Sequence, residues 1–313
     1  MVEILKSNGK GIKRAVEILA SGGLVAFPTE TVYGLGCDAL NERAVWKVFE
    51  IKKRPLSKPL IVGVSSKDEV YSLAEVPEDA EKLIDAFFPG PLTIVLRKKS
   101  SVPDIVTGGG SKVAVRMPDH EIPLKLMKGL GNPIVVPSAN ISGRPSPMTY
   151  RHVIEDLGDN IEAIVVGECS VGIESTIVDV TEKPARVVRT GAIGLAELKK
   201  HVDLIVGKER EGTYHISCPV YVFIGRRAEE KVREFAEKAR SRGLSVAIIA
   251  KKLEGENVIT IGSSPEEYTS NLFSAIRKAE SMRPNLIVIE GLEEHEGVMD
   301  RLKKLAGERI FRT

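Results

Sequence analysis

Residues 60–96 read LIVGVSSKDEVYSLAEVPEDAEKLIDAFFPGPLTIVL and set the pattern of the fold. They contain two short apolar runs, 60–64 and 92–96, which are typical of buried strands. Between these runs the sequence predicts two helices, at 67–75 and 78–87. Strands that are apolar on both faces and alternate with helices indicate an α/β sheet covered by helices.

The same alternation continues on both sides of this stretch. Further strands are predicted at 24–27, 113–117, 133–137, 163–167, 175–180 and 186–188. Further helices are predicted at 11–20, 42–53, 148–157 and 194–201. Near residue 207 the pattern gives way to the polar stretch GKEREGTYHISCP, 207–219, which we interpret as a linker.

A second run of alternating elements follows that linker. Strands are predicted at 221–224, 245–250, 258–261 and 286–290, and helices at 228–241, 265–281 and 296–306. This order is typical of a small parallel α/β domain with right-handed crossovers. The sequence therefore predicts one domain over 1–206 and another over 220–313.

Charge and cysteine content exclude several classes of protein. The chain has 313 residues, 45 Lys plus Arg and 43 Asp plus Glu, a net charge of +2, which argues against nucleic-acid binding through bulk charge. Cys37, Cys169 and Cys218 form no Cys-x-x-Cys pair, so a disulfide scaffold or cysteine-rich zinc site is not expected. No apolar run reaches ~18 residues and the N-terminus lacks a signal-type run, so we expect a cytoplasmic protein with no membrane segment.

Common catalytic motifs are also missing from the sequence. It contains no G-x-x-x-x-G-K-[ST] loop, no G-x-G-x-x-G after a strand and no G-x-S-x-G elbow. The five histidines show no metal-ligand spacing, so no metal-binding residues are predicted.

Two polar segments follow predicted elements early in the chain. FPTETVYGLGCDA, 27–39, places the Thr31 hydroxyl in a loop at the carboxyl end of a strand, where α/β sheets bind ligands, although a plain polar turn fits equally well. IKKRPLSKPLIV, 51–62, holds four cations in a proline-stiffened loop, which suits a polyphosphate. Cations at a helix C-terminus are also favourable for the helix dipole alone.

Later segments supply a buried cation and small polar groups. In KVAVRMP, 112–118, Arg116 lies within an apolar strand, where it pairs either with a carboxylate of the chain or with a substrate carboxylate. VVPSANISGRPSP, 135–147, offers hydroxyls and an amide that bind phosphate and ribose oxygens or simply form turns. Cations, hydroxyls and amides suit phosphate-transfer chemistry that works by positioning and charge stabilisation.

Taken together and in order, these segments resemble the threonylcarbamoyl-AMP synthase family in its two-domain form. The matching motifs are PTETVYGLG (28–36), KxRP with KPLIV (52–62), PGPLT (89–93), VAVRMP (113–118), PSAN (137–140), RPSP (144–147), ESTI (174–177) and VVR (187–189). The resemblance implies a twisted YrdC-like mixed sheet flanked by helices, plus a smaller Rossmann-like parallel α/β domain. Tyr214-His215 resembles part of the family's linker.

The resemblance also implies an activity and its residues. The family joins L-threonine, bicarbonate and ATP into L-threonylcarbamoyladenylate and releases pyrophosphate, and the product serves N6-threonylcarbamoyladenosine formation in tRNA. Carried over by position, the threonine site comprises Thr31, Arg116, Val136 and Ser175. The ATP site comprises Arg54, Lys58, Lys112, Ser138, Asn140, Ser146 and Arg189, with Lys52 and Arg54 as catalytic candidates.

Cofactors and partners follow from the same resemblance. Mg²⁺ is expected with ATP, held mainly by its phosphates. The downstream tRNA threonylcarbamoyl transferase machinery is the expected partner, and direct tRNA binding is expected to be weak. Two other functions stay open at this point: a double-stranded RNA-binding or RNA-remodelling module, and carbamoyl transfer to another acceptor.

Overall fold

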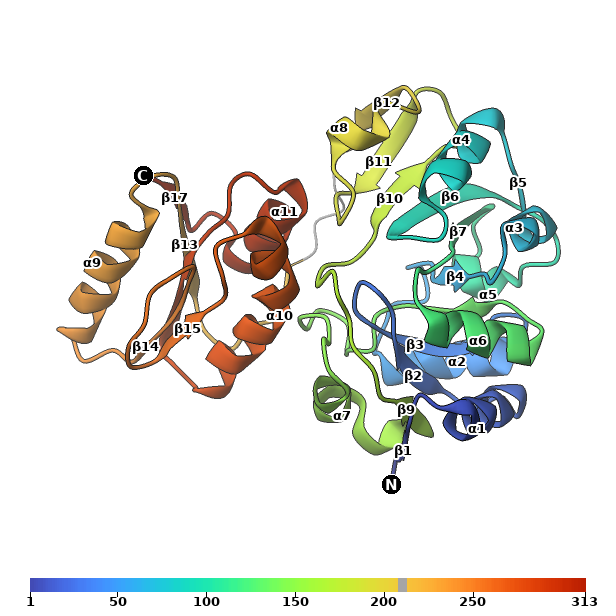
Figure 1. Cartoon of the computed structure of the whole chain (residues 1–313), viewed down its shortest axis with the longest axis horizontal. Coiled ribbons are helices and arrows are strands. Elements are labelled where there is room, and N and C mark those ends of the chain that lie inside the picture. Colours follow the sequence, from blue (N-terminus) through green and yellow to red (C-terminus); the bar gives the residue numbers. More distant parts are fainter. Residues whose placement is uncertain (208–212) are drawn as a thin grey trace. The chain divides into compact units, whose positions relative to one another are not determined.

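A computed structural model describes residues 1–207 and 213–313 (Figure 1). The described residues group into two compact units. The first comprises Met1–Ser142, Ser146–Ser170 and 174–207, and the second comprises Gly143–Pro145, Val171–Ile173 and 213–313. Part of the predicted linker, 208–212, lies outside the described residues.

A mixed sheet forms the centre of the first unit. In spatial order its described strands are β1-β9-β2-β3-β8-β4-β7-β6-β10-β11-β12, and β5 pairs with β6. Their bounds are β1 (Glu3–Leu5), β2 (Val25–Pro28), β3 (Tyr33–Asp38), β4 (Ile61–Gly63), β5 (Ala74–Glu75), β6 (Leu92–Lys98), β7 (Lys112–Arg116), β8 (Ile134–Val135), β9 (Ala163–Val165), β10 (Thr176–Asp179), β11 (Ala185–Arg189) and β12 (Leu204–Val206). Parallel pairs such as β4–β7 and β6–β10 alternate with antiparallel pairs such as β6–β7.

Helices and one 3₁₀ turn flank this sheet. They are α1 (Gly9–Ala20), α2 (Glu42–Ile51), α3 (Lys67–Leu73), α4 (Glu78–Phe87), α5 (Asp104–Thr107), α6 (Glu121–Leu130), α7 (Tyr150–Leu157), η1 (Gly158–Asn160) and α8 (Leu195–Leu198). Helix α1 begins where the Asn8 side chain accepts a hydrogen bond from the Gly11 amide, and it buries Ile12, Ala15 and Leu19 on one face. Its apolar period therefore fixes the face that contacts the sheet.

Several predictions in this unit need correction. Residues 33–38, predicted as loop, form strand β3, which pairs antiparallel with β2 as a hairpin. Helices α5 and α6 and strands β1 and β12 were not predicted. The helix predicted at 67–75 ends at Leu73, and Ala74–Glu75 form strand β5 against β6. The strand predicted at 133–137 is regular only over Ile134–Val135, because Pro133 and Pro137 bracket it and cannot donate to a ladder.

The second unit confirms the predicted parallel α/β pattern. Its elements are β13 (Val220–Ile224), α9 (Ala228–Arg240), β14 (Val246–Ala250), β15 (Val258–Thr260), α10 (Pro265–Ser281), β16 (Leu286–Glu290), α11 (Glu296–Ala306) and β17 (Ile310–Arg312). The strands run parallel in the order β15-β14-β16-β13-β17, and β17 was not predicted. Helix α9 covers one face of this sheet, and α10 and α11 cover the other (Figure 1).

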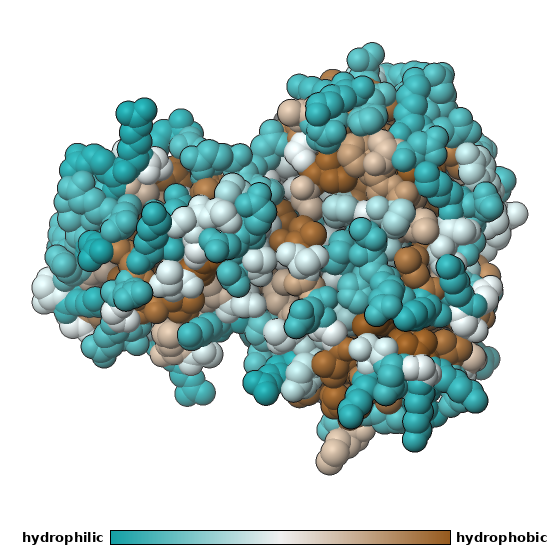
Figure 2. Space-filling model, viewed as in Figure 1, coloured by the Kyte–Doolittle hydropathy of each residue, from teal (hydrophilic) through white to brown (hydrophobic). Residues whose placement is uncertain are grey.

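The surface carries mainly hydrophilic side chains on the face shown in Figure 2, with apolar residues in small areas between them. Most apolar side chains are buried instead. One buried cluster of the first unit includes Leu24, Leu35, Val62, Ile94 and Val115. Among the described residues, no helix combines the length and apolar character needed to cross a membrane.

Candidate active site

Arg116 ends strand β7 and is buried, with the residue 7% exposed. Its Nη2 donates a hydrogen bond to Thr31 Oγ1 at 3.0 Å and lies 2.7 Å from Glu30 Oε1, while Nε donates to the Gly90 carbonyl at 3.3 Å. An internal salt bridge, one of the two predicted alternatives, is therefore present. Arg116 also lines a cavity, so its contact with Glu30 does not remove it from a ligand's reach.

The tight connection between β2 and β3 places Thr31. Thr29 Oγ1 donates to the Val32 carbonyl at 2.7 Å and lies 2.9 Å from Thr31 Oγ1. Hydroxyl bonds of this kind shape the turn between the paired strands. They hold the Thr31 hydroxyl toward Arg116.

Strand pairing also brings Ser175 and Arg189 together. Antiparallel β10 and β11 set Ile177 opposite Arg189, so the arginine reaches back to the residue before β10. Arg189 Nη2 donates to the Ser175 carbonyl at 2.8 Å and to Ser175 Oγ at 3.1 Å. Ser175 Oγ also lies 2.7 Å from Thr93 Oγ1 on the parallel neighbour β6. The hydroxyl is therefore fixed from two strands.

Arg54 organises the loop that follows α2. Its Nε donates to the Lys58 carbonyl at 3.1 Å and its Nη2 to the Pro59 carbonyl at 2.8 Å. Burial lowers the pKa of Arg54, yet a guanidinium stays charged at any physiological pH. The Lys58 side chain is exposed.

Lys52 lies beneath the segment that leaves β8. The residue is 2% exposed, and its Nζ donates to the carbonyls of Ser138 and Asn140 at 2.5 Å each. Burial, and next the nearby charge of Arg54, lower the pKa of Lys52 to about 7. Further along the chain, Ser146 Oγ donates to Glu174 Oε1 at 2.5 Å.

A cavity of about 90 Å³ lies among these groups. Seven predicted residues line it: Thr31, Arg54, Arg116, Val136, Ser138, Ser175 and Arg189. The sequence prediction missed four others that line it: Val32, Ile61, Pro137 and Glu174. Glu174 could have been found from the ESTI motif, in which it precedes Ser175.

Five predicted residues do not line this cavity: Lys52, Lys58, Lys112, Asn140 and Ser146. Lys52 was predicted to be catalytic, but its ammonium is taken up by backbone carbonyls. Lys112 pairs with Asp179 at 2.8 Å across the intervening strand β6, because β10 is parallel to β6 and β7 is antiparallel to it, so the end of β10 lies near the start of β7. Whether these residues contact a bound substrate stays a prediction.

Gly63 explains the shape of one cavity wall. A Cβ added there would lie 2.8 Å from Val136 Cγ2, so the Val136 side chain occupies the space a side chain at 63 would need. The wall is apolar at this point, and polar contacts come from the other sides of the cavity.

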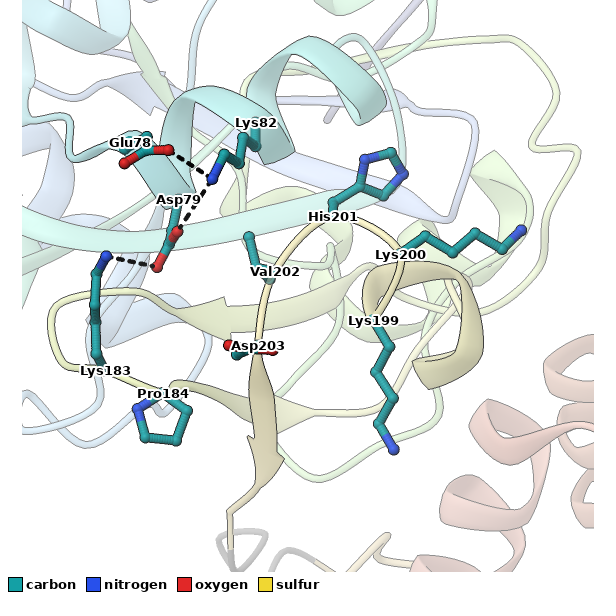
Figure 3. A pocket seen from close by; sticks show the side chains of 10 residues that line it. All are labelled: Glu78, Asp79, Lys82, Lys183, Pro184, Lys199, Lys200, His201, Val202 and Asp203. Carbon is teal, nitrogen blue, oxygen red and sulfur yellow. Dashed lines mark ion pairs between the residues drawn. The ribbon is translucent and has the colours of Figure 1, made fainter.

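A larger cavity, of about 680 Å³, contains none of the predicted residues (Figure 3). Its lysines are partly neutralised within it: Lys82 Nζ lies 2.7 Å from Glu78, and Lys183 Nζ lies 3.6 Å from Asp79. These exposed pairs leave little net charge to attract an anion. The smaller, arginine-lined cavity is therefore the candidate active site.

Among residues 1–207 and 213–313, no group of three or more His, Cys, Asp or Glu side chains could hold a metal ion.

Two family models match the chain. The model described as "Telomere recombination" matches residues 17–191, and that described as "Threonylcarbamoyl-AMP synthase, C-terminal domain" matches residues 208–307. Both units of the chain are thus accounted for.

Individual relatives match over almost the whole length. The threonylcarbamoyl-AMP synthase of Pyrococcus abyssi is 41% identical, with 96% of each chain covered. That of Bacillus subtilis is 33% identical over 98% of this chain and 96% of its own. The crystal structure of P. abyssi Sua5 complexed with L-threonine superposes with a TM-score of 0.94 at 39% identity, covering 100% of this chain and 99% of that one. By sequence and by structure, the chain belongs to the threonylcarbamoyl-AMP synthase family.

Proposed function

We propose that this protein makes L-threonylcarbamoyladenylate from L-threonine, bicarbonate and ATP, with release of pyrophosphate. The reaction is a nucleotidyl transfer, and its product would serve N6-threonylcarbamoyladenosine formation in tRNA. The observation that carries the proposal is the composition of the cavity. Three arginines and three hydroxyl side chains line it, a set that suits the threonine carboxylate and the ATP phosphates: Arg54, Arg116, Arg189, Thr31, Ser138 and Ser175.

Threonine would bind at the Arg116 end of this set. Arg116 offers a charge-assisted donor to the substrate carboxylate, and Thr31 and Ser175 offer hydroxyls. Val136 supplies the apolar wall. A buried guanidinium binds a carboxylate more strongly than an exposed one, because little water competes for it.

ATP would bind across Arg54, Ser138 and Arg189. Two arginines offset the charge of the triphosphate, and the Ser138 hydroxyl reaches a phosphate or ribose oxygen. Lys58, Lys112, Asn140 and Ser146 are proposed as outer contacts. Mg²⁺ would come with the nucleotide, since Mg²⁺ in such sites is held largely by phosphates and water.

The proposed reaction has two steps, carbamate formation and adenylyl transfer. The threonine ammonium and bicarbonate give the carbamate, one water and one proton. A carbamate oxygen then attacks the α-phosphorus in line, the bond to the β-phosphate bridging oxygen breaks, and pyrophosphate leaves. The protein contributes position and positive charge rather than a nucleophile. A tRNA threonylcarbamoyl transferase would consume the product, and direct tRNA binding would be weak.

The test is an assay of pyrophosphate release from ATP with threonine and bicarbonate omitted in turn. We expect release only when both are present, together with the adenylate as a product detected by mass spectrometry. Pyrophosphate release at the same rate without threonine would rule out the proposal.

A further inference from the structure

Lys52 ties one end of helix α2 to the segment that follows β8. Its Nζ donates to the carbonyl oxygens of Ser138 and Asn140, each at 2.5 Å. Its own backbone carbonyl accepts a hydrogen bond from the Ser142 amide at 2.8 Å. One residue therefore holds three points of a five-residue segment.

Burying the Lys52 ammonium costs folding free energy. Lys52 is 2% exposed as a whole residue, so its ammonium has lost nearly all of its hydration, and an apolar side chain of similar length would avoid that loss. The charged groups that act on it are Arg54, which disfavours its charge, and Asp156, which favours it. Neither takes the place of the two carbonyl oxygens as a close partner.

The carbonyls that Lys52 holds belong to residues next to the cavity. Ser138 lines the cavity, whereas Lys52 does not. Ser138 is also bridged to Gly34 in β3, so the segment is held from the hairpin side as well. Without Lys52, each of the two carbonyls would lose one donor; the Ser138 carbonyl would keep only the Asn140 amide at 3.0 Å, and the segment would shift to reach water.

We propose that Lys52 is a positioning residue that fixes the Ser138–Ser142 segment in its nucleotide-binding conformation without touching the nucleotide. This inference rests on the proposed use of ATP by the cavity. An amine keeps two N–H groups after losing a proton, so both carbonyls keep a donor on either side of the Lys52 pKa.

The test compares Lys52→Met with Lys47→Met in the full chain. Lys47 is the matched control, because it lies on the same helix and its Nζ also donates to a carbonyl, that of Gly22 at 3.0 Å. Lys52→Arg tests geometry, since it keeps a positive charge but brings a larger, planar head group into a filled site. Three quantities are measured: amide hydrogen exchange without ligand, ATP affinity by calorimetry, and the Michaelis constants for ATP and threonine.

For Lys52→Met we expect the Asn140 and Ser142 amides to exchange at least about tenfold faster and ATP affinity to fall about tenfold. The threonine Michaelis constant should change less than that for ATP. Lys47→Met should leave all of these values unchanged, and Lys52→Arg should resemble Lys52→Met. If Lys52→Met does not fold, Lys52→Arg carries the same comparison.

Two results would overturn the inference. One is unchanged exchange at Asn140 and Ser142 with weaker ATP binding, which would mean that the charge acts directly on the nucleotide. The other is faster exchange with unchanged ATP affinity, which would make Lys52 a purely structural residue. Failure of the proposed function would be seen separately, because the wild-type protein would then make no threonine-dependent pyrophosphate while the exchange data remained interpretable.

Discussion

Replacing Arg116 should separate two roles of this residue. The structure shows the first, an ion pair with Glu30, and the proposed function requires the second, binding of the threonine carboxylate. Arg116→Ala removes the partner of the buried Glu30 carboxylate, which lies 2.7 Å away with a side chain 8% exposed. Removing one member of a buried ion pair costs about 3–5 kcal/mol of folding free energy, because the remaining charge is left uncompensated. A lower affinity for threonine in this variant alone would therefore be ambiguous.

The double variant Glu30→Gln/Arg116→Met resolves the ambiguity. It removes both charges together, so most of the lost stability should return. Threonine binding should stay impaired, because the charge-assisted contact to its carboxylate is still missing. That contact is worth about 1.5–3 kcal/mol, roughly 10- to 150-fold in affinity.

The assay combines urea denaturation with threonine Michaelis constants for Arg116→Ala, the double variant and Arg116→Lys. Arg116→Lys should recover only part of the affinity, since an ammonium lacks the planar fork. Arg97→Met, an exposed arginine on β6, is the control and should alter stability by no more than about 0.5 kcal/mol. A stable double variant with the wild-type threonine constant would show that Arg116 serves only the fold.

Three further outcomes are expected. Burial lowers the pKa of Lys52 to about 7, so above that pH the unfolded chain binds more protons than the folded chain. The free energy of unfolding should therefore rise from pH 7 toward 10, by up to ~1.4 kcal/mol per pH unit. Urea titrations of Lys52→Met should lack this rise. Ser175→Ala removes the buried hydroxyl that contacts Thr93 and Arg189, so thermal unfolding should show a loss of about 1–3 kcal/mol and steady-state kinetics a higher threonine Michaelis constant. Ser264→Ala breaks the capping box of α10, which should cost about 1 kcal/mol by denaturation while calorimetry shows unchanged ATP affinity.

The sequence predicted most elements because their apolar patterns follow local burial. Strand β3 was predicted as a loop because its glycines lower the strand propensity of the segment. The structure shows why glycine is there: a Cβ at Gly34 would lie 2.7 Å from Val136 Cγ1, and one at Gly36 would lie 2.5 Å from Phe27 Cε1. Helix α6 was also not predicted; it carries Pro123 in its first turn, where proline is tolerated.

The site was predicted less completely than the fold, for a different reason. Ordered motifs identified seven of the residues that line the cavity, but not how each side chain is engaged. Glu30 precedes Thr31 in the same motif, and nothing in its spacing indicates that it faces Arg116 from the connection between β2 and β3. Similarly, Lys52 stands among exposed cations in sequence, and only the packing of α2 shows that it points inward. Such contacts depend on long-range pairing, which local pattern does not encode.

The order of strands in the first sheet has a consequence during synthesis on the ribosome. Strand β10 pairs with β6 on one side and with β11 on the other. Ser175 precedes β10 and Arg189 ends β11, so this wall of the cavity comes from a late part of the first unit's sequence. A nascent chain that has passed Arg116 already holds Glu30 and Thr31. The roughly 70 residues that still separate it from Arg189 take about 4–15 s at about 5–20 residues per second. Throughout that interval, and in any product terminated before Ser175, the growing polypeptide lacks the side of the cavity that Ser175 and Arg189 form.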